Sequence, residues 1–282
     1  MMYTYIPERF EKVVVLHALR ISWLRHKDAP LLMGIHGLPG EGKTFQCKIV
    51  LEKNGFKVFQ ISGGSLESKN AGEPARIVRE QYEQAQKFCA ESDVNKAAII
   101  IDDADAAFGN WGELFQYTVN TQNLLAELMN IADYNANNQK EIRIPIYLTG
   151  NDFTKIYGPL KRAGRMETFH WAPTDEERLK YIYFEFEMLD LEECKELLEF
   201  TKTKIEGIGN LSTAFFSDIK TCIYDDYIWN QYISSRDTSL TGSVISGMGL
   251  IDKYPEVSLE MIKEKVKLKI EELEKTNHGY VN

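Results

Sequence analysis

The stretch Gly37-Leu38-Pro39-Gly40-Glu41-Gly42-Lys43-Thr44 follows the pattern G-x-x-x-x-G-K-T, which is typical of a phosphate-binding loop. An apolar run at residues 31–35 precedes it, and residues 45–51 follow it without a helix-breaking residue. A loop with this pattern binds phosphate when a strand precedes it and a helix follows it. A chance glycine turn is the alternative, and the flanking segments disfavour it. We therefore predict that Lys43 reaches the β and γ phosphates of a nucleotide and that Thr44 binds Mg²⁺.

The composition narrows the class of protein. The chain has 282 residues, of which 44% are hydrophobic, so it can form one large domain or one domain with a smaller second one. The formal net charge of −9 disfavours nucleic acid as the main partner, because such partners select basic surfaces. No apolar run is long enough to cross a bilayer, and four scattered cysteines lack the spacing of a metal site. We expect a cytoplasmic protein without a membrane partner.

A second motif, which is acidic, follows the apolar run Ala97–Ile101. A continuous apolar run is typical of a buried parallel strand, and Asp102, Asp103 and Asp105 follow it directly. Ligands bind at the carboxyl edge of such sheets, so the layout resembles a Walker B motif. Asp102 is then the candidate Mg²⁺ partner. Asp103 occupies the position where many such enzymes carry the glutamate that orients the attacking water. A solvated acidic loop is the alternative.

Further polar residues follow a later strand pattern. Residues 144–151 indicate a strand that ends at Asn151, whose amide can hold a water near the γ phosphate. Alone, Asn151 would be an ordinary turn residue. Arg162 and Arg165, three residues apart, lie near the end of the α/β part. A basic surface turn is the alternative there.

The pattern changes near residue 172. Thr174 and Glu177 have the spacing of a capping box, and the remainder of the chain is helical in pattern. We predict an α/β nucleotide-binding domain at residues 1–172, which is a P-loop parallel sheet flanked by helices. A smaller, all-helical lid domain is predicted at residues 173–282.

At this point the chain resembles the AAA+ ATPases, and within them the Rubisco activases of plants and green algae. Eight groups of residues, spread over nearly the whole chain, carry the resemblance. They are residues 37–46, 67–68 with 70–75, 116–120, 128–133, 149–153, 164–167 with 171–174, 215–216 and 224–226.

The resemblance implies roles for individual residues. ATP or ADP with Mg²⁺ is the implied cofactor, Asp102-Asp103 is Walker B and Asn151 is sensor 1. Arg162 and Arg165 are implied arginine fingers that enter the neighbouring subunit's site, in a ring homo-oligomer expected to be a hexamer. The implied nucleotide-contacting residues are Ile6, Gly37, Pro39, Gly40, Glu41, Gly42, Lys43, Thr44, Phe45 and Lys220.

The chain departs from the family pattern in three ways, which affect the expected client binding, the C-terminal tail and the sensor 2 residue. Similarity begins almost at residue 1, so we expect the chain to lack the N-terminal extension that engages Rubisco, and also the C-terminal tail. Lys220 and Cys222 stand where the family has arginines, so Lys220 alone is left to serve as sensor 2. Trp111, flanked by Gly109 and Gly112, is the candidate for touching a client in the ring's pore. The alternative is that Trp111 folds back onto the core.

The sequence therefore predicts an ATP-hydrolysing remodeller of a protein client, with Rubisco as one candidate client. The alternative is a nucleotide-dependent assembly switch or binding module with slow hydrolysis. Asp103, one methylene shorter than glutamate, favours the switch. A DNA-linked loader is disfavoured by the acidic charge.

Overall fold

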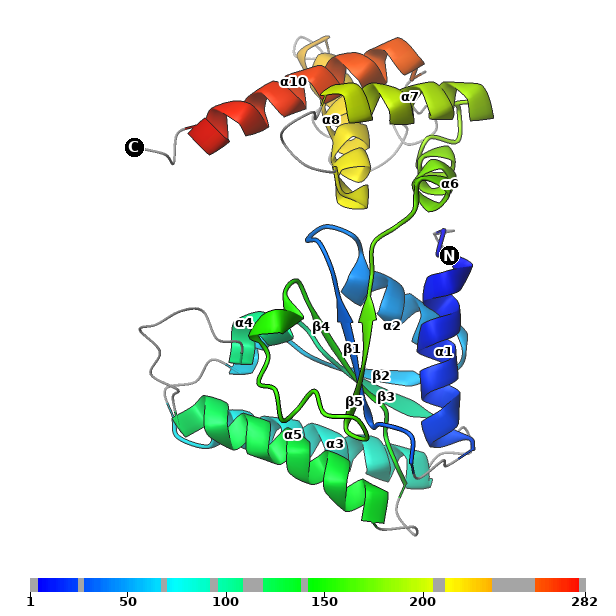
Figure 1. Ribbon diagram of the computed structural model, residues 1–282. Coiled ribbons are helices and arrows are strands. Elements are labelled where there is room, and N and C mark those ends of the chain that lie inside the picture. Colours follow the sequence, from blue (N-terminus) through cyan, green and yellow to red (C-terminus); the bar gives the residue numbers. More distant parts are fainter. Residues whose placement is uncertain are drawn as a thin grey trace. The chain divides into compact units, whose positions relative to one another are not determined.

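The computed structural model describes residues 5–24, 28–66, 70–91, 96–108, 119–137, 142–204, 211–234 and 257–278. The chain divides into two compact units, one of Ile6–Ala172 and one that contains Tyr5 and the residues from Pro173 onward. In Figure 1 the first unit contains the sheet, and the second is made of helices. Among the described residues, no helix combines the length and apolar character that crossing a membrane requires.

The first unit is built on five parallel strands. The strands are β1 (Leu32–His36), β2 (Lys57–Ile61), β3 (Ala97–Ile101), β4 (Ile146–Gly150) and β5 (Met166–His170). They form one sheet in the order β2-β3-β4-β1-β5, and each neighbouring pair is parallel. The predicted parallel α/β fold is confirmed.

Helices cover both faces of this sheet. The helices are α1 (Glu8–Ser22), α2 (Lys43–Lys53), α3 (Glu73–Glu91), α4 (Ala104–Phe108) and α5 (Val119–Asn137), with short 3-10 turns η1 (Gly63–Leu66) and η2 (Phe153–Lys155). The first two lie on one face, and α3 and α5 lie on the other (Figure 1). Alternate strand residues join the two cores: Ile99 packs toward α3 and α5, whereas Ile100 packs toward α1 and α2. Burial on both faces explains the continuous apolar run of β3.

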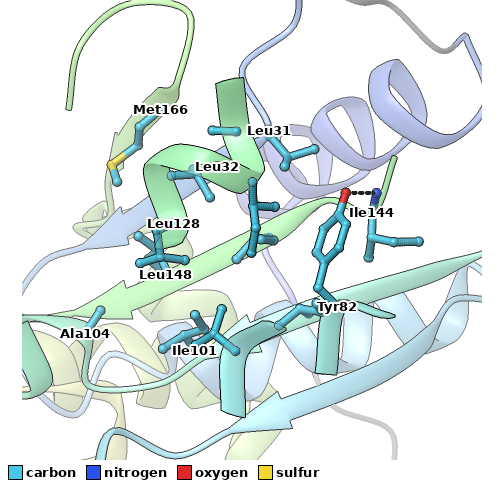
Figure 2. Packing of buried hydrophobic residues seen from close by; sticks show 14 of the residues in the cluster. Leu31, Leu32, Tyr82, Ile101, Ala104, Leu128, Ile144, Leu148 and Met166 are labelled. Carbon is cyan, nitrogen blue, oxygen red and sulfur yellow. Dashed lines mark hydrogen bonds between the residues drawn. The ribbon is translucent and has the colours of Figure 1, made fainter. Parts of the chain in front are cut away.

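The core on the α3 side also contains one polar anchor. Tyr82 of α3 is buried, and its hydroxyl accepts a hydrogen bond of 3.1 Å from the backbone N–H of Ile144. Figure 2 shows this bond beside Leu31, Leu128 and Leu148. It satisfies a buried backbone donor just before β4, a group that would be costly to leave unpaired.

The sequence analysis did not predict β5 or α4. In β5 only Met166 is fully buried and the other residues are half-buried or exposed, because the strand lies at the edge of the sheet. A strand with this burial lacks the apolar run that revealed β3. The helix α4 has only five residues, too few to show a helical period.

The second unit is a helical bundle of α6 (Asp175–Glu185), α7 (Leu191–Lys204), α8 (Thr213–Ser234) and α10 (Leu259–His278). The capping box predicted at the start of α6 is confirmed: the Glu177 N–H donates to the Thr174 hydroxyl, and the Thr174 N–H donates to the Glu177 carboxylate. The buried face of α10, including Ile262 and Val266, packs with residues of α6, α7 and α8.

A buried histidine makes the stability of the first unit sensitive to acid. His17 of α1 is fully buried, and its Nε2 lies 3.1 Å from the Pro30 carbonyl oxygen. The pKa of His17 is lowered from 6.5 to about 3, mainly by burial and also by the charges of Arg20 and Arg143, while the hydrogen bond with the Pro30 carbonyl opposes the shift. In the unfolded chain the His17 imidazole is therefore protonated below about pH 6.5, whereas in the folded protein it stays neutral down to about pH 3. The contribution of His17 to stability is present above pH 6.5 and is lost as the pH falls.

The free energy of unfolding should fall by about 2 kcal/mol between pH 7 and pH 5 through His17 alone. Urea unfolding of the wild type and of His17→Gln at both pH values measures this term, which the variant should lack. Equal slopes for the two proteins would contradict the assignment.

Candidate nucleotide site

Three chemically active segments meet at the carboxyl edge of the sheet. Strand β1 runs into the phosphate-binding loop at Gly37, β3 ends before Asp102, and β4 ends before Asn151. Because β4 lies between β3 and β1, its end lies between the other two. Parallel sheets bind ligands at this edge.

The loop takes the backbone shape that its glycines permit. Gly40 and Gly42 have φ of 75° and 67°, values that residues with a Cβ rarely adopt. Gly42 directly precedes α2, so the loop ends at a helix N-terminus that can attract a phosphate. Pro39 is exposed at the tip of the loop, and Phe45 is exposed on the first turn of α2.

Lys43 lies inside the loop rather than in solvent. Its Nζ donates to the carbonyl oxygens of Gly37 and Leu38, both at 2.8 Å. It also donates to Oδ1 of Asn151 at 3.0 Å. One ammonium group thus connects the predicted phosphate-binding loop with the predicted sensor 1 residue.

Thr44 and Asp102 form a compact oxygen cluster. The Thr44 hydroxyl donates to Asp102 Oδ1 at 2.6 Å, and Thr149 of β4 donates to the same oxygen at 2.7 Å. The Thr44 and Thr149 hydroxyl oxygens are 2.9 Å apart. Hydroxyl and carboxylate oxygens suit Mg²⁺, which takes few protein ligands when phosphates supply the others. The described residues hold no group of three or more His, Cys, Asp or Glu placed to bind a metal.

Asp103 has an unusual backbone. Its φ of 48° is positive, which is uncommon for a residue other than glycine and is typical of a constrained functional position. Its N–H donates to Asp102 Oδ1 at 3.0 Å. Burial, followed by the charges of Asp102 and Asp105, raises the pKa of the Asp103 carboxyl. A raised pKa makes the carboxylate a better proton acceptor.

The two candidate finger arginines lie at the other end of the sheet. The Arg165 carbonyl accepts from the N–H of Leu32, the first residue of β1. The phosphate-binding loop follows the last residue of β1, so this strand separates the two by about 15 Å. Neither arginine is therefore placed to reach a nucleotide in its own subunit.

Arg162 and Arg165 differ in their surroundings. Arg165 donates to both carboxylate oxygens of Asp133 in α5, at 2.8 and 2.6 Å, and to the Pro159 carbonyl at 3.0 Å. Arg162 is exposed, and within the described part of the chain its guanidinium has no hydrogen-bond partner. Only Arg162 is free to extend away from the subunit.

Ile6 and Lys220 have partners inside their own units. Ile6 is half-buried against the core of α1 and α2. Lys220 of α8 donates to the carbonyl oxygen of Glu185 at 2.7 Å, and its Nζ lies 3.6 Å from the Glu185 carboxylate. Because Glu185 is the last residue of α6, Lys220 stabilises the C-terminus of that helix. The role of Lys220 as sensor 2 stays a prediction, and Trp111 with its flanking glycines lies outside the described residues.

Sequence reasoning missed Trp171, because the pattern of residues 171–174 indicates a linker. Trp171 is fully buried, its N–H donates to the His36 carbonyl at 2.6 Å, and its indole Nε1 donates to the Glu41 carbonyl at 2.9 Å. The Arg9 guanidinium stacks 4.7 Å from the ring centre. Trp171 thus holds both ends of the phosphate-binding loop, and no local pattern indicates this.

The family follows from a comparison with known proteins. The model of the "ATPase family associated with various cellular activities (AAA)" matches residues 33–174, which span both the loop and the acidic cluster. The chain belongs to the AAA ATPase family. The resemblance to AAA+ ATPases that the sequence indicated is confirmed.

Individual relatives of this AAA protein are Rubisco activases. The chain is 34% identical to the "Ribulose bisphosphate carboxylase/oxygenase activase, chloroplastic" of Solanum pennellii, over 96% of this chain and 60% of the relative. It is 36% identical to the Arabidopsis thaliana protein of the same name, over 92% of this chain and 56% of the relative. The activase of an Anabaena strain is 39% identical over 79% of this chain and 55% of the relative. The chain spans 60% or less of the length of these three curated relatives.

Proposed function

We propose that this AAA protein hydrolyses ATP with Mg²⁺ and works as a ring that remodels a protein client. The observation that carries the proposal is that Lys43, Thr44, Asp102 and Asn151 are brought together by hydrogen bonds at one sheet edge. In AAA proteins these positions bind the phosphates and the metal and orient the attacking water.

Each residue has a distinct task in the proposed reaction. On binding of ATP, Lys43 exchanges its carbonyl partners for the β and γ phosphate oxygens. Thr44 and Asp102 would hold Mg²⁺, which would neutralise charge on the phosphates. Asn151 orients the attacking water, and Asp103, with its raised pKa, accepts the water's proton. The tasks are positioning and charge stabilisation, with no covalent step for the protein.

We further propose that residues 1–172 bind the nucleotide and that residues 173–282 act as a lid. The placement of Arg162 at the opposite end of β1 supports catalysis between subunits, because the guanidinium can complete only a neighbour's site. Contacts of this kind run head to tail and close into a ring. The hexamer expected from the resemblance is part of this proposal.

ATP turnover measured against protein concentration tests the proposal. The rate per subunit should rise steeply as subunits assemble, and Lys43→Ala should lack both turnover and tight ATP binding. Turnover that is constant over the concentration range would contradict catalysis between subunits. Assembly driven by ATP with negligible turnover would favour the switch described above.

We propose Rubisco as the client, because the relatives are named as activases of ribulose bisphosphate carboxylase/oxygenase. Asp103→Asn should bind ATP without hydrolysing it, and so hold the client in a stable complex. Affinity capture with this variant in ATP, compared with ADP, tests whether Rubisco is retained. The cytoplasmic location expected from the sequence stays a prediction.

A further inference from the structure

Asp105 is a buried acid at the nucleotide site to which the function above assigns no role. It lies in the short helix α4, three residues after Asp102, and its exposed fraction is only 2%. Oδ2 of its carboxylate accepts hydrogen bonds from the backbone N–H groups of Asn151 and Asp152, both at 2.9 Å. A single buried oxygen thus binds two successive donors where the chain leaves β4.

The carboxylate is also packed tightly against that strand end. A Cβ added to Gly150, the last residue of β4, would lie 2.3 Å from Asp105 Oδ1. Glycine is therefore required at this position for the carboxylate to approach the backbone. The close fit restricts both the acid and the chain turn that follows β4.

The bonds of Asp105 determine the direction of the Asn151 side chain. Asn151 is held through its backbone by Asp105, and through its side chain by Lys43 at 3.0 Å. A hydrogen bond to a charged acceptor is about twice as strong as a neutral one, and burial protects it from competing water. Loss of the carboxylate would free the turn that carries the amide while leaving the phosphate-binding loop intact.

We propose that Asp105 is a positioning residue for ATP hydrolysis, which fixes the turn after β4 so that the Asn151 amide stays directed toward Lys43 and the γ phosphate. This proposal rests on the ATPase function proposed above. Asp105 does not contact the substrate, so its removal should affect the chemical step more than the binding of ATP.

The variants Asp105→Asn and Asp105→Ala test the proposal in the full chain. We expect kcat to fall about tenfold or more for Asn and further for Ala, while KM and the Kd for ATP change less than threefold. Asp152→Asn is the matched control, because it makes the same chemical change one residue beyond Asn151. The Asp152 carboxylate contacts residues of its own turn, because it accepts from the N–H and hydroxyl of Thr154 and lies 3.6 Å from the Lys155 ammonium group. This variant should therefore keep the wild-type kcat.

Amide hydrogen exchange provides a readout that does not depend on turnover. In Asp105→Ala the amides of Asn151 and Asp152 should exchange at least tenfold faster, while those within β4 keep their protection. If the wild type proves to lack ATPase activity, the proposed function fails and this exchange result still reports on the contact. Wild-type kcat in both Asp105 variants, or unfolding of both, would overturn the positioning role.

Discussion

Replacing Arg162 by alanine should lower ATP turnover by a factor of about 10³–10⁵ and leave ATP affinity within a few-fold, as expected for an arginine finger. The guanidinium is exposed, and it lies at the amino end of β1, opposite the end that carries the phosphate-binding loop. It therefore contributes nothing to nucleotide binding in its own subunit. Steady-state turnover and equilibrium binding of ATP separate the two quantities.

Mixing two inactive variants tests whether the arginine acts on a neighbour. Arg162→Ala keeps its phosphate-binding loop, and Lys43→Ala keeps its arginine. In a mixed ring, the intact loop of one subunit lies beside the intact arginine of the other, so the mixture should recover a measurable part of the turnover. No recovery from subunits that co-assemble, or wild-type turnover by Arg162→Ala alone, would remove Arg162 from the finger role.

Arg165→Ala is the matched control and should behave differently. Arg165 joins the segment before β5 to α5 through its paired bonds with Asp133. Its removal should lower the free energy of unfolding by about 1–2 kcal/mol, because a partly exposed charged pair is lost together with a bond to a carbonyl. We expect its effect on turnover to accompany this lower stability. A full loss of turnover at wild-type stability would instead make Arg165 a finger.

The sequence alone does not predict the difference between these two arginines. Both lie in the same short basic stretch, and the contacts of Arg165 distinguish them, above all the one with Asp133, 32 residues earlier. The phosphate-binding loop was predictable because its residues are consecutive. β3 was predictable because burial on both faces leaves an uninterrupted apolar run, which the edge strand β5 lacks.

Long-range contacts account for the rest of the site. Asp105 reaches Asn151 across 46 residues, and Trp171 reaches Glu41 across 130. An aspartate that follows a buried strand looks like any other acid in a polar turn. A tryptophan two residues before a proline likewise resembles part of a linker. Their roles depend on which strand ends are neighbours, and that follows from the strand order and not from local pattern.

The second large effect is expected at Gly37, where the loop begins. Its φ is 153°, and an added Cβ would lie 2.0 Å from the Trp171 carbonyl oxygen and 3.0 Å from the carbonyl carbon. Both are backbone atoms, so no side-chain rotation can relieve the clash. The backbone of Trp171 is also bound to His36, because its N–H donates to the His36 carbonyl at 2.6 Å. An alanine must therefore push β1 and the end of β5 apart.

We expect Gly37→Ala to lower the free energy of unfolding of the first unit by about 3–5 kcal/mol, the range of severe backbone and packing disruptions. For a unit of this size that corresponds to a fall in melting temperature of roughly 10–15 °C. ATP binding should be lost even below the new melting temperature, because the displaced backbone carries the loop whose N–H groups bind phosphate. Calorimetry and nucleotide titration measure the two effects.

Gly55→Ala separates the clash from the backbone preference of glycine. Gly55 follows α2, has φ of 79°, and has nothing within 4 Å of an added Cβ. Its replacement should lower the free energy of unfolding by about 1–2 kcal/mol, through the strain of a left-handed backbone alone, and should leave ATP binding unchanged. If the two variants melt alike and both bind ATP, the contact between Gly37 and Trp171 does not hold the loop. A much larger effect at Gly37 would mean that the buried tryptophan, 130 residues beyond Glu41, sets the shape of the phosphate site.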